Sequence, residues 1–97
     1  MESAWERMLD TVEQLADHPD HPIDTDVDAR LAELATQAMS DGDIDGELHV
    51  PDVVRWLSVL ALGHRAVRAA RPGVDPESDL GNLRRIATRW LHPARPR

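Results

Sequence analysis

Several residue types are missing from this chain of 97 residues, and each absence excludes a class of chemistry. Cysteine is absent, so disulfide bonds, thiolate nucleophiles, cysteine-ligated zinc and iron–sulfur clusters are excluded. All eleven basic residues are arginine, which excludes catalysis through a lysine Schiff base. No serine stands in a glycine-flanked nucleophile turn, and no glycine-rich phosphate-binding loop is present. We therefore expect that the chain is not an enzyme and needs no cofactor.

Long hydrophobic runs are also lacking. The longest apolar run extends from Val53 to Leu62 and is interrupted by Arg55 and Ser58, so it falls short of the roughly 20 residues that a bilayer span needs. The acidic N-terminal sequence differs from the basic and then apolar plan of a secretion signal. We expect no membrane association and a cytoplasmic location.

Length and composition are those of one small globular domain, residues 1–97. Hydrophobic residues make up 41% of the chain and charged residues 30%, which is typical of a folded protein. A domain of this size buries only roughly 60 to 65% of the surface of its unfolded chain, so its stability margin is small. Such domains often gain stability by forming oligomers.

The net charge of -7 is divided unevenly along the chain. Residues 1–52 carry fifteen acidic residues and two arginines, whereas residues 53–97 carry three acidic residues and nine arginines, which gives -13 and +6. We expect acidic and basic helices to pair within the domain or across a dimer. No aromatic residues are interleaved with the arginines, so direct nucleic acid binding is not expected. An acidic module that binds a basic protein partner remains an alternative function.

Four segments show the hydrophobic period of an amphipathic helix, with apolar residues at steps of three and four. No segment of useful length shows the alternation of a strand. The sequence therefore predicts an all-α fold of four helices, at about residues 3–16, 25–40, 51–71 and 76–91, with a loop at 17–24 and a tail at 92–97.

Local signals predict where these helices begin and end. Pro51 and Pro76 suit the first turn of the third and fourth helices, where a missing amide proton removes no hydrogen bond. Thr25, followed by Asp28 three residues later, resembles a capping box at the start of the second helix. Gly42 follows that helix and accepts the left-handed conformation that ends many helices.

The third predicted helix is apolar around most of its circumference. Such a helix is normally buried in a core or sandwiched at an interface, and a chain of 97 residues has little room for a fully central helix. Gly63 lies in this helix and costs about 1 kcal/mol of helix stability relative to alanine, which indicates close approach of another helix or a local bend. We therefore predict homodimerisation through the last two helices as a four-helix bundle. The predicted interface residues are Val53, Trp56, Leu57, Leu60, Gly63, Val67, Leu83, Ile86, Ala87 and Trp90.

An acidic loop at residues 41–52 matches the spacing of an EF-hand calcium loop. Carboxylates stand at its first, third, fifth and twelfth positions, glycine at its sixth, and predicted helices lie on both sides. The twelfth residue is aspartate rather than the longer glutamate, and an acidic turn that caps helices explains the same residues. A single calcium-binding module is therefore an alternative function. Its candidate ligands are Asp41, Asp43, Asp45, Glu47 and Asp52.

Residues 34–95 resemble the C-terminal half of tetracycline-repressor-type (TetR-family) regulators. Gly-Glu-Leu at residues 46–48 is similar to the turn that in this family precedes a sequence such as Pro-Asp-Val-Val-Arg-Trp-Leu, here residues 51–57. An apolar helix with an internal glycine follows, here at residues 62–64, and then a proline-containing loop and a closing helix, here at residues 83–91. The resemblance covers about two thirds of the chain.

This resemblance implies that the last two long helices form a dimer interface and that the preceding helices enclose a small-molecule pocket. The family's helix-turn-helix has no counterpart, because nothing before Asp41 provides a basic recognition helix. We therefore predict a regulatory, sensor-like domain rather than a DNA-binding protein. It is expected to form a homodimer and to take a small apolar ligand near Trp5, Trp56 and His64.

Overall fold

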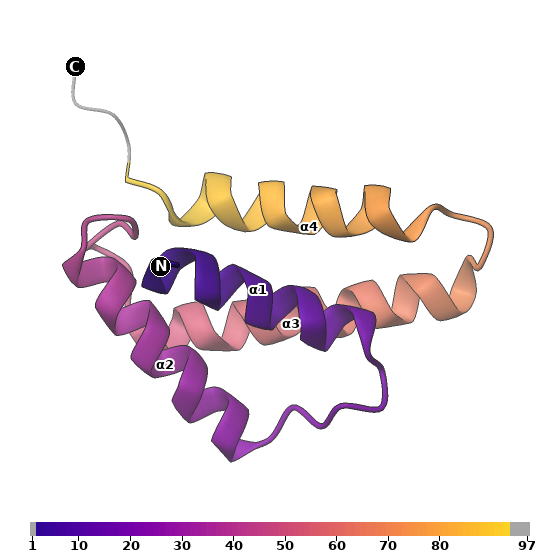
Figure 1. Cartoon of the computed structure of the whole chain (residues 1–97), viewed down its shortest axis with the longest axis horizontal. Helices are drawn as coiled ribbons and strands as arrows, with labels where there is room; N and C mark the ends of the chain where they lie inside the picture. Colours follow the sequence, from indigo (N-terminus) through magenta and orange to yellow (C-terminus); the bar gives the residue numbers. More distant parts are fainter. Residues whose placement is uncertain (1, 94–97) are drawn as a thin grey trace.

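The computed structural model describes residues 2–93, which form four α-helices (Figure 1). The predicted all-α, four-helix architecture is confirmed, and each helix end lies within one residue of its predicted position. Residues 94–97 of the predicted tail lie outside the described residues. The helices are α1 (Ala4–Asp17), α2 (Thr25–Ser40), α3 (Val50–Ala70) and α4 (Pro76–Leu91).

The second helix begins with a different cap from the predicted one. The carboxylate of Asp24 accepts a hydrogen bond of 3.1 Å from the amide of Val27, and Thr25 is already the first helical residue. The capping box predicted for Thr25 and Asp28 is therefore wrong by one position, because aspartate satisfies a free amide as well as threonine does. At the other end, Gly42 has a φ of 87°, which confirms its left-handed conformation.

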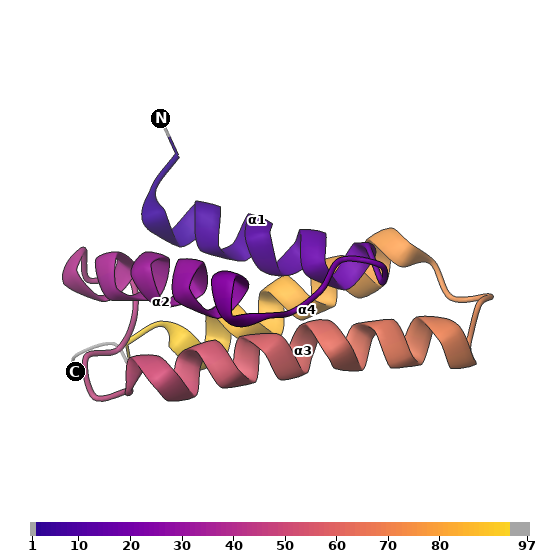
Figure 2. The same ribbon diagram turned by 90° about the horizontal axis from the view of Figure 1, so that it is seen from below.

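The helices α1 and α3 form the centre of the molecule, with α2 packed on one side and α4 on the other (Figure 1, Figure 2). The first helix contacts all three others, whereas α2 and α4 do not contact each other. A short loop at residues 71–75 joins α3 to α4, so the two helices run antiparallel. Between the helices lies an apolar core whose largest fully buried side chains include Met8, Leu9, Leu31, Leu57 and Leu91.

The acidic and basic parts of the chain meet between α1 and α4. An Nη1 group of Arg84 donates to Oδ1 of Asp10 at 3.2 Å and to Oε1 of Glu13 at 3.1 Å. Proximity to the carboxyl group of Glu2, whose own pKa is raised by Asp10, and the contact with Arg84 hold the pKa of Asp10 below its ordinary value of 3.8. The predicted pairing of acidic and basic helices is confirmed at this contact.

A second arginine, Arg65 on α3, forms hydrogen bonds with the end of α1 and with the loop that follows α1. The guanidinium of Arg65 donates three hydrogen bonds of 2.7 to 3.0 Å to backbone carbonyl oxygens, those of Leu15, His18 and His21. Hydrogen bonds from a charged donor are stronger than neutral ones. This side chain therefore holds a loop that contains two prolines and cannot form a regular helix.

Candidate functional site

The third helix has two apolar sides. Its inner side is fully buried and includes Val53, Leu57 and Ala61, whereas on its outer side Trp56 and Val67 remain 49% and 46% exposed. With 21 residues α3 is the longest helix. No helix in residues 2–93 is long and apolar enough to cross a membrane. The folded chain therefore carries large apolar side chains on the outside of this helix.

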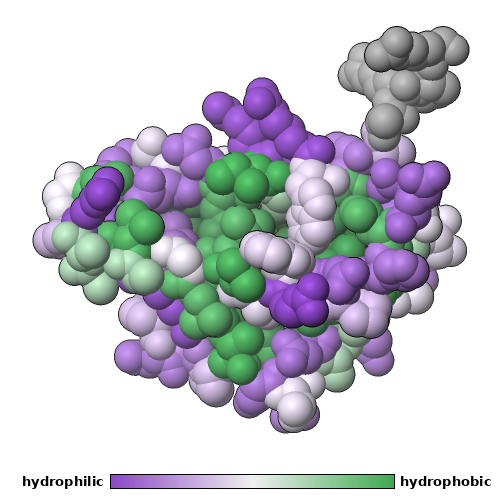
Figure 3. All heavy atoms as spheres, turned by 180° about the vertical axis from the view of Figure 1, so that it is seen from behind, coloured by the Kyte–Doolittle hydropathy of each residue, from purple (hydrophilic) through white to green (hydrophobic). Residues whose placement is uncertain are grey.

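The fourth helix adds two more large apolar side chains beside this surface. Ile86 is 55% exposed and Trp90 is 36% exposed, and both line hollows that α3 also lines. Figure 3, which views the molecule from behind Figure 1, shows hydrophobic residues gathered in the middle of this side with hydrophilic residues around them. We name this surface the α3–α4 face; it consists of Trp56, Val59, Leu60, Gly63, Val67, Ile86 and Trp90.

Two hollows follow one another along the α3–α4 face. The first has a volume of about 360 Å³ and is lined by Trp56, Leu60, Ile86 and Trp90. The second has a volume of about 380 Å³ and extends to Val67, near the C-terminal end of α3. Leu60 and Ile86 line both hollows. The two hollows therefore form one continuous groove between the helices.

Two polar side chains line the second hollow. His64 is only 8% exposed, and its Nε2 is buried with no hydrogen-bond partner among residues 2–93. The Oδ2 atom of Asp79 is also buried and unpaired within this part of the chain. Leaving a buried polar atom unpaired costs about 1–3 kcal/mol, so most such atoms have a partner. These two unpaired polar atoms lie beneath this end of the groove.

The ten residues predicted for the dimer interface divide between the two sides of their helices. Six lie on the α3–α4 face, but Val53, Leu57, Leu83 and Ala87 are buried in the core of the chain itself. The prediction is corrected for Val53, Leu57 and Ala87, whereas Leu83 also lines the second hollow of the α3–α4 face. Both sides of α3 are apolar, so hydropathy does not separate the side that packs within the chain from the side that stays exposed.

The structure does not bring together Trp5, Trp56 and His64, the residues predicted to bind a small apolar ligand. Trp5 stacks on the ring of His92, with the ring centroids 4.4 Å apart, where the start of α1 meets the end of α4. Trp56 lies on the α3–α4 face, and His64 is buried beside Ala16. Trp56 and His64 thus line successive parts of one groove, whereas Trp5 lies apart from it, so the predicted site of three residues is not assembled.

The carboxylates predicted to bind calcium have different partners. The Oδ1 atom of Asp41 accepts a hydrogen bond from Gln37, and the Oδ1 atom of Asp52 lies 3.1 Å from the guanidinium of Arg55. Within residues 2–93, no group of three or more aspartate, glutamate or histidine side chains is placed to hold a metal ion. The set of Asp41, Asp43, Asp45, Glu47 and Asp52 is therefore not assembled as a calcium site.

The acidic loop, which connects α2 to α3, instead forms hydrogen bonds with the end of α4. Ile44 is buried in the core. The amide of Asp45 donates to the carbonyl oxygen of Leu91 at 2.8 Å, and Nδ1 of His92 lies 2.7 Å from the carbonyl oxygen of Asp43. These contacts favour the structural turn, which was the other explanation of this sequence.

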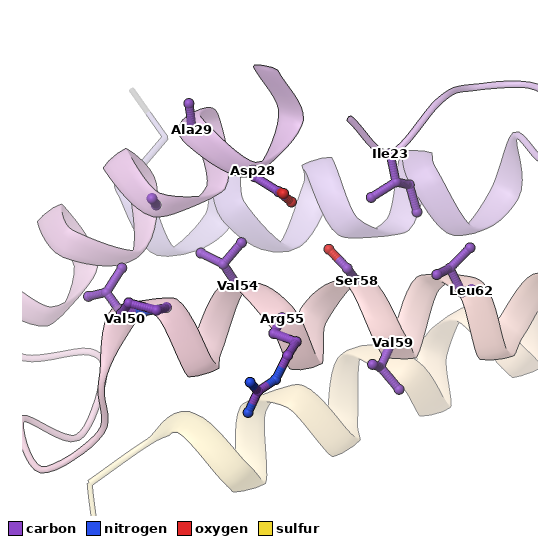
Figure 4. A pocket seen from close by; sticks show the side chains of 11 residues that line it. Ile23, Asp28, Ala29, Val50, Val54, Arg55, Ser58, Val59 and Leu62 are labelled. Atoms are coloured by element: carbon purple, nitrogen blue, oxygen red, sulfur yellow. The ribbon is translucent and has the colours of Figure 1, made fainter. Parts of the chain in front are cut away.

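A cavity that the sequence did not predict lies between α2 and α3 (Figure 4). It has a volume of about 610 Å³, and its apolar walls include Ile23, Val54 and Leu62. Asp28 and Ser58 are polar residues that also line it. We name this cavity the α2–α3 groove. One sequence signal pointed toward it, because Ile23 is an apolar residue in an otherwise polar loop.

No protein-family model, curated protein or solved structure matches the chain. Its functional interpretation therefore depends on the geometry of the α3–α4 face and of the α2–α3 groove.

Proposed function

We propose that the chain is a non-enzymatic regulatory domain that acts as a homodimer, with the α3–α4 face as the contact between two copies. The observation that carries the proposal is the exposure of Trp56, Val67, Ile86 and Trp90 along one continuous groove. Contiguous exposed apolar surface marks interaction sites, and tryptophan is enriched in them. The last two helices also form the dimer interface in the TetR-family regulators that this sequence resembles.

Charge at the two ends of the α3–α4 face favours a second copy of the chain as the partner. Asp79, with its unpaired carboxylate oxygen, lies near the start of α4, and the exposed Arg89 lies near its end. A two-fold axis level with residue 84 of α4 would place Asp79 of each copy opposite Arg89 of the other. An interface of this symmetry joins one apolar surface to itself and also joins opposite charges.

Part of the acidic surface is less suited to an outside partner. Arg84 already pairs with Asp10 and Glu13 on α1, so part of the acidic half of the chain is neutralised internally. In contrast, no part of residues 2–93 covers the exposed apolar side chains of the α3–α4 face. A homodimer therefore accounts for the exposed groups better than an acidic interaction module does.

The substitution Ile86→Arg tests this proposal. Ile86 is 55% exposed, so an arginine is tolerated by the single chain but places a charge in the middle of the interface. Val74→Arg is the matched control, because Val74 is an exposed apolar residue in the loop between α3 and α4, outside the α3–α4 face. We expect light scattering to report the 10.8 kDa monomer for Ile86→Arg and twice that mass for Val74→Arg. Equal masses for the two variants would contradict the proposed interface.

A further inference from the structure

We infer that the α2–α3 groove binds a small apolar molecule that carries one positively charged amine. The groove lies on the side of α3 that packs against α2, whereas the α3–α4 face lies beside α4, and Val59 is the one residue that lines both. The inference therefore adds a ligand site to the proposed dimer and does not depend on it.

The size and the walls of the groove fit a small organic molecule. Its volume of about 610 Å³ falls within the range of roughly 300 to 1,000 Å³ that is typical of ligand pockets. Ile23 approaches from the loop before α2, and Val54 and Leu62 rise from α3 on the opposite wall (Figure 4). Three separate segments of the chain, residue 23 in the loop, α2 and α3, thus contribute apolar surface.

Two polar side chains point into this apolar space. Figure 4 shows the carboxylate of Asp28 directed from α2 toward the side of α3 that carries the hydroxyl of Ser58. The Oγ atom of Ser58 is buried and has no hydrogen-bond partner in the described part of the chain. Asp28 forms no ion pair within residues 2–93. A ligand with a hydrogen-bond donor would therefore find one accessible charged acceptor, the carboxylate of Asp28, with the buried hydroxyl of Ser58 beneath the wall of the groove.

The charge of the groove selects a cation. Arg55 also lines it, but its guanidinium lies 3.1 Å from Asp52 and its side chain points away from Asp28 in Figure 4. Asp28 is exposed, so water solvates its carboxylate while the groove is empty. An apolar ligand would displace that water, and only a ligand with a positive group would replace the lost interaction. An anionic ligand would be repelled by the same carboxylate.

Isothermal titration calorimetry with three ten-carbon probes tests the inference on the full chain. The probes are decylammonium, decanol and decanoate, which share the apolar chain and differ in charge. We expect saturable binding of one decylammonium per chain, with an affinity at least about tenfold higher than that of decanol or decanoate, because a hydrogen bond to a charged group supplies that difference. No saturable binding, or equal affinity for the three probes, would overturn the inference.

Two isosteric variants separate the groove from the general negative charge of the protein. Asp28→Asn should lower the affinity for decylammonium by about tenfold. Asp26→Asn removes the same charge from the same helical turn, but Asp26 does not line the groove, so its affinity should change by less than about twofold. Equal losses in the two variants would show nonspecific attraction and overturn the inference.

A third variant tests whether the probe occupies the groove itself. Ala29 is exposed on α2 and lines the groove, so Ala29→Trp should fill the space without disturbing the core. We expect this variant to lose decylammonium binding while its circular dichroism spectrum keeps its helical signal. Unchanged binding with unchanged helicity would place the probe elsewhere. The oligomeric state, measured separately by sedimentation, reports on the proposed dimer and not on this site.

Discussion

Nδ1 of His64 lies 3.2 Å from the carbonyl oxygen of Ala16, and this contact ties the middle of α3 to the last turn of α1. Because a carbonyl oxygen only accepts hydrogen bonds, Nδ1 carries the proton of the ring. Nε2 then remains as a buried acceptor, with no partner among the residues that the structure describes. One side chain thus holds two helices together and offers an acceptor beside the α3–α4 face.

The hydrogen bond of His64 predicts a graded loss of stability. His64→Ala leaves the carbonyl oxygen of Ala16 buried without a partner and opens a cavity, so the free energy of unfolding should fall by roughly 1 to 3 kcal/mol. His64→Asn should lose less, because its side-chain amide can donate from nearly the same position as Nδ1. Urea denaturation of both variants measures the difference. Equal losses would show that the histidine contributes only its volume.

Two glycines provide a matched test of the interface. Gly63 on α3 and Gly81 on α4 are exposed, and a Cβ atom at either position would meet open space in the single chain. Alanine at either position should therefore stabilise the folded chain by about 0.5 to 1 kcal/mol.

The two glycines should differ in their effect on the dimer. Only Gly63 lies on the α3–α4 face, so Gly63→Ala should also weaken the dimer by obstructing close approach of the partner helix. Gly81→Ala should leave the dimer constant unchanged. Sedimentation equilibrium at a series of concentrations measures the dimer dissociation constant of each variant. Identical dissociation constants for the two variants would show that Gly63 does not lie in the interface.

Charge exchange tests the orientation of the two copies. If Asp79 pairs with Arg89 of the partner subunit, Asp79→Arg and Arg89→Asp should each weaken the dimer, because each places like charges opposite one another. The double variant restores opposite charges and should recover most of the affinity. Recovery is not expected if the helices associate in another register. If the double variant loses as much dimer affinity as the two single variants together, this orientation is contradicted, even if the protein remains dimeric.

The contact between Arg84 and α1 should depend on pH. The pKa of Asp10 is lowered from its ordinary 3.8 in the folded chain, by proximity to the carboxyl group of Glu2 and by the contact with Arg84. A carboxyl group with a lowered folded pKa stabilises the fold above its unfolded pKa, and the contribution is lost as the pH falls through the folded value.

Arg84→Gln should therefore destabilise the protein at neutral pH and much less in acid. These pairs are partly exposed, so the loss at neutral pH should be about 0.5 to 1 kcal/mol. Thermal unfolding of both proteins between neutral pH and values below 3.8 should show the difference shrinking toward the acid end. The control is Arg85→Gln, which changes an exposed neighbouring arginine. A constant difference for Arg84→Gln across this range would contradict the account.

Helix boundaries could be predicted from the sequence because they depend on neighbouring residues. Asp75 and Pro76 illustrate this: the carboxylate of Asp75 accepts a hydrogen bond of 3.3 Å from the amide of Glu77, and the proline fits the first turn. Gly42 takes its left-handed conformation for an equally local reason. The fold class followed from these signals and from the period of the apolar residues.

The sites could not be predicted in the same way, because they depend on how the helices cross. Val53 and Trp56 are both apolar and stand three residues apart on α3, yet one is buried and the other exposed. Ile23 and Leu62 line one groove although they are distant in the sequence. The spacing of the acidic loop gave the order of its carboxylates but not their directions, and those directions decide whether a metal ion is bound.

The mass of the wild-type chain in solution tests the central claim most directly. Sedimentation velocity at micromolar concentration should show a species of twice 10.8 kDa, because the α3–α4 face leaves Trp56, Ile86 and Trp90 uncovered in a single chain. Dilution should return the monomer through a single equilibrium. A species of 10.8 kDa at every concentration would contradict the account, since the exposed apolar face would then have no second copy to cover it.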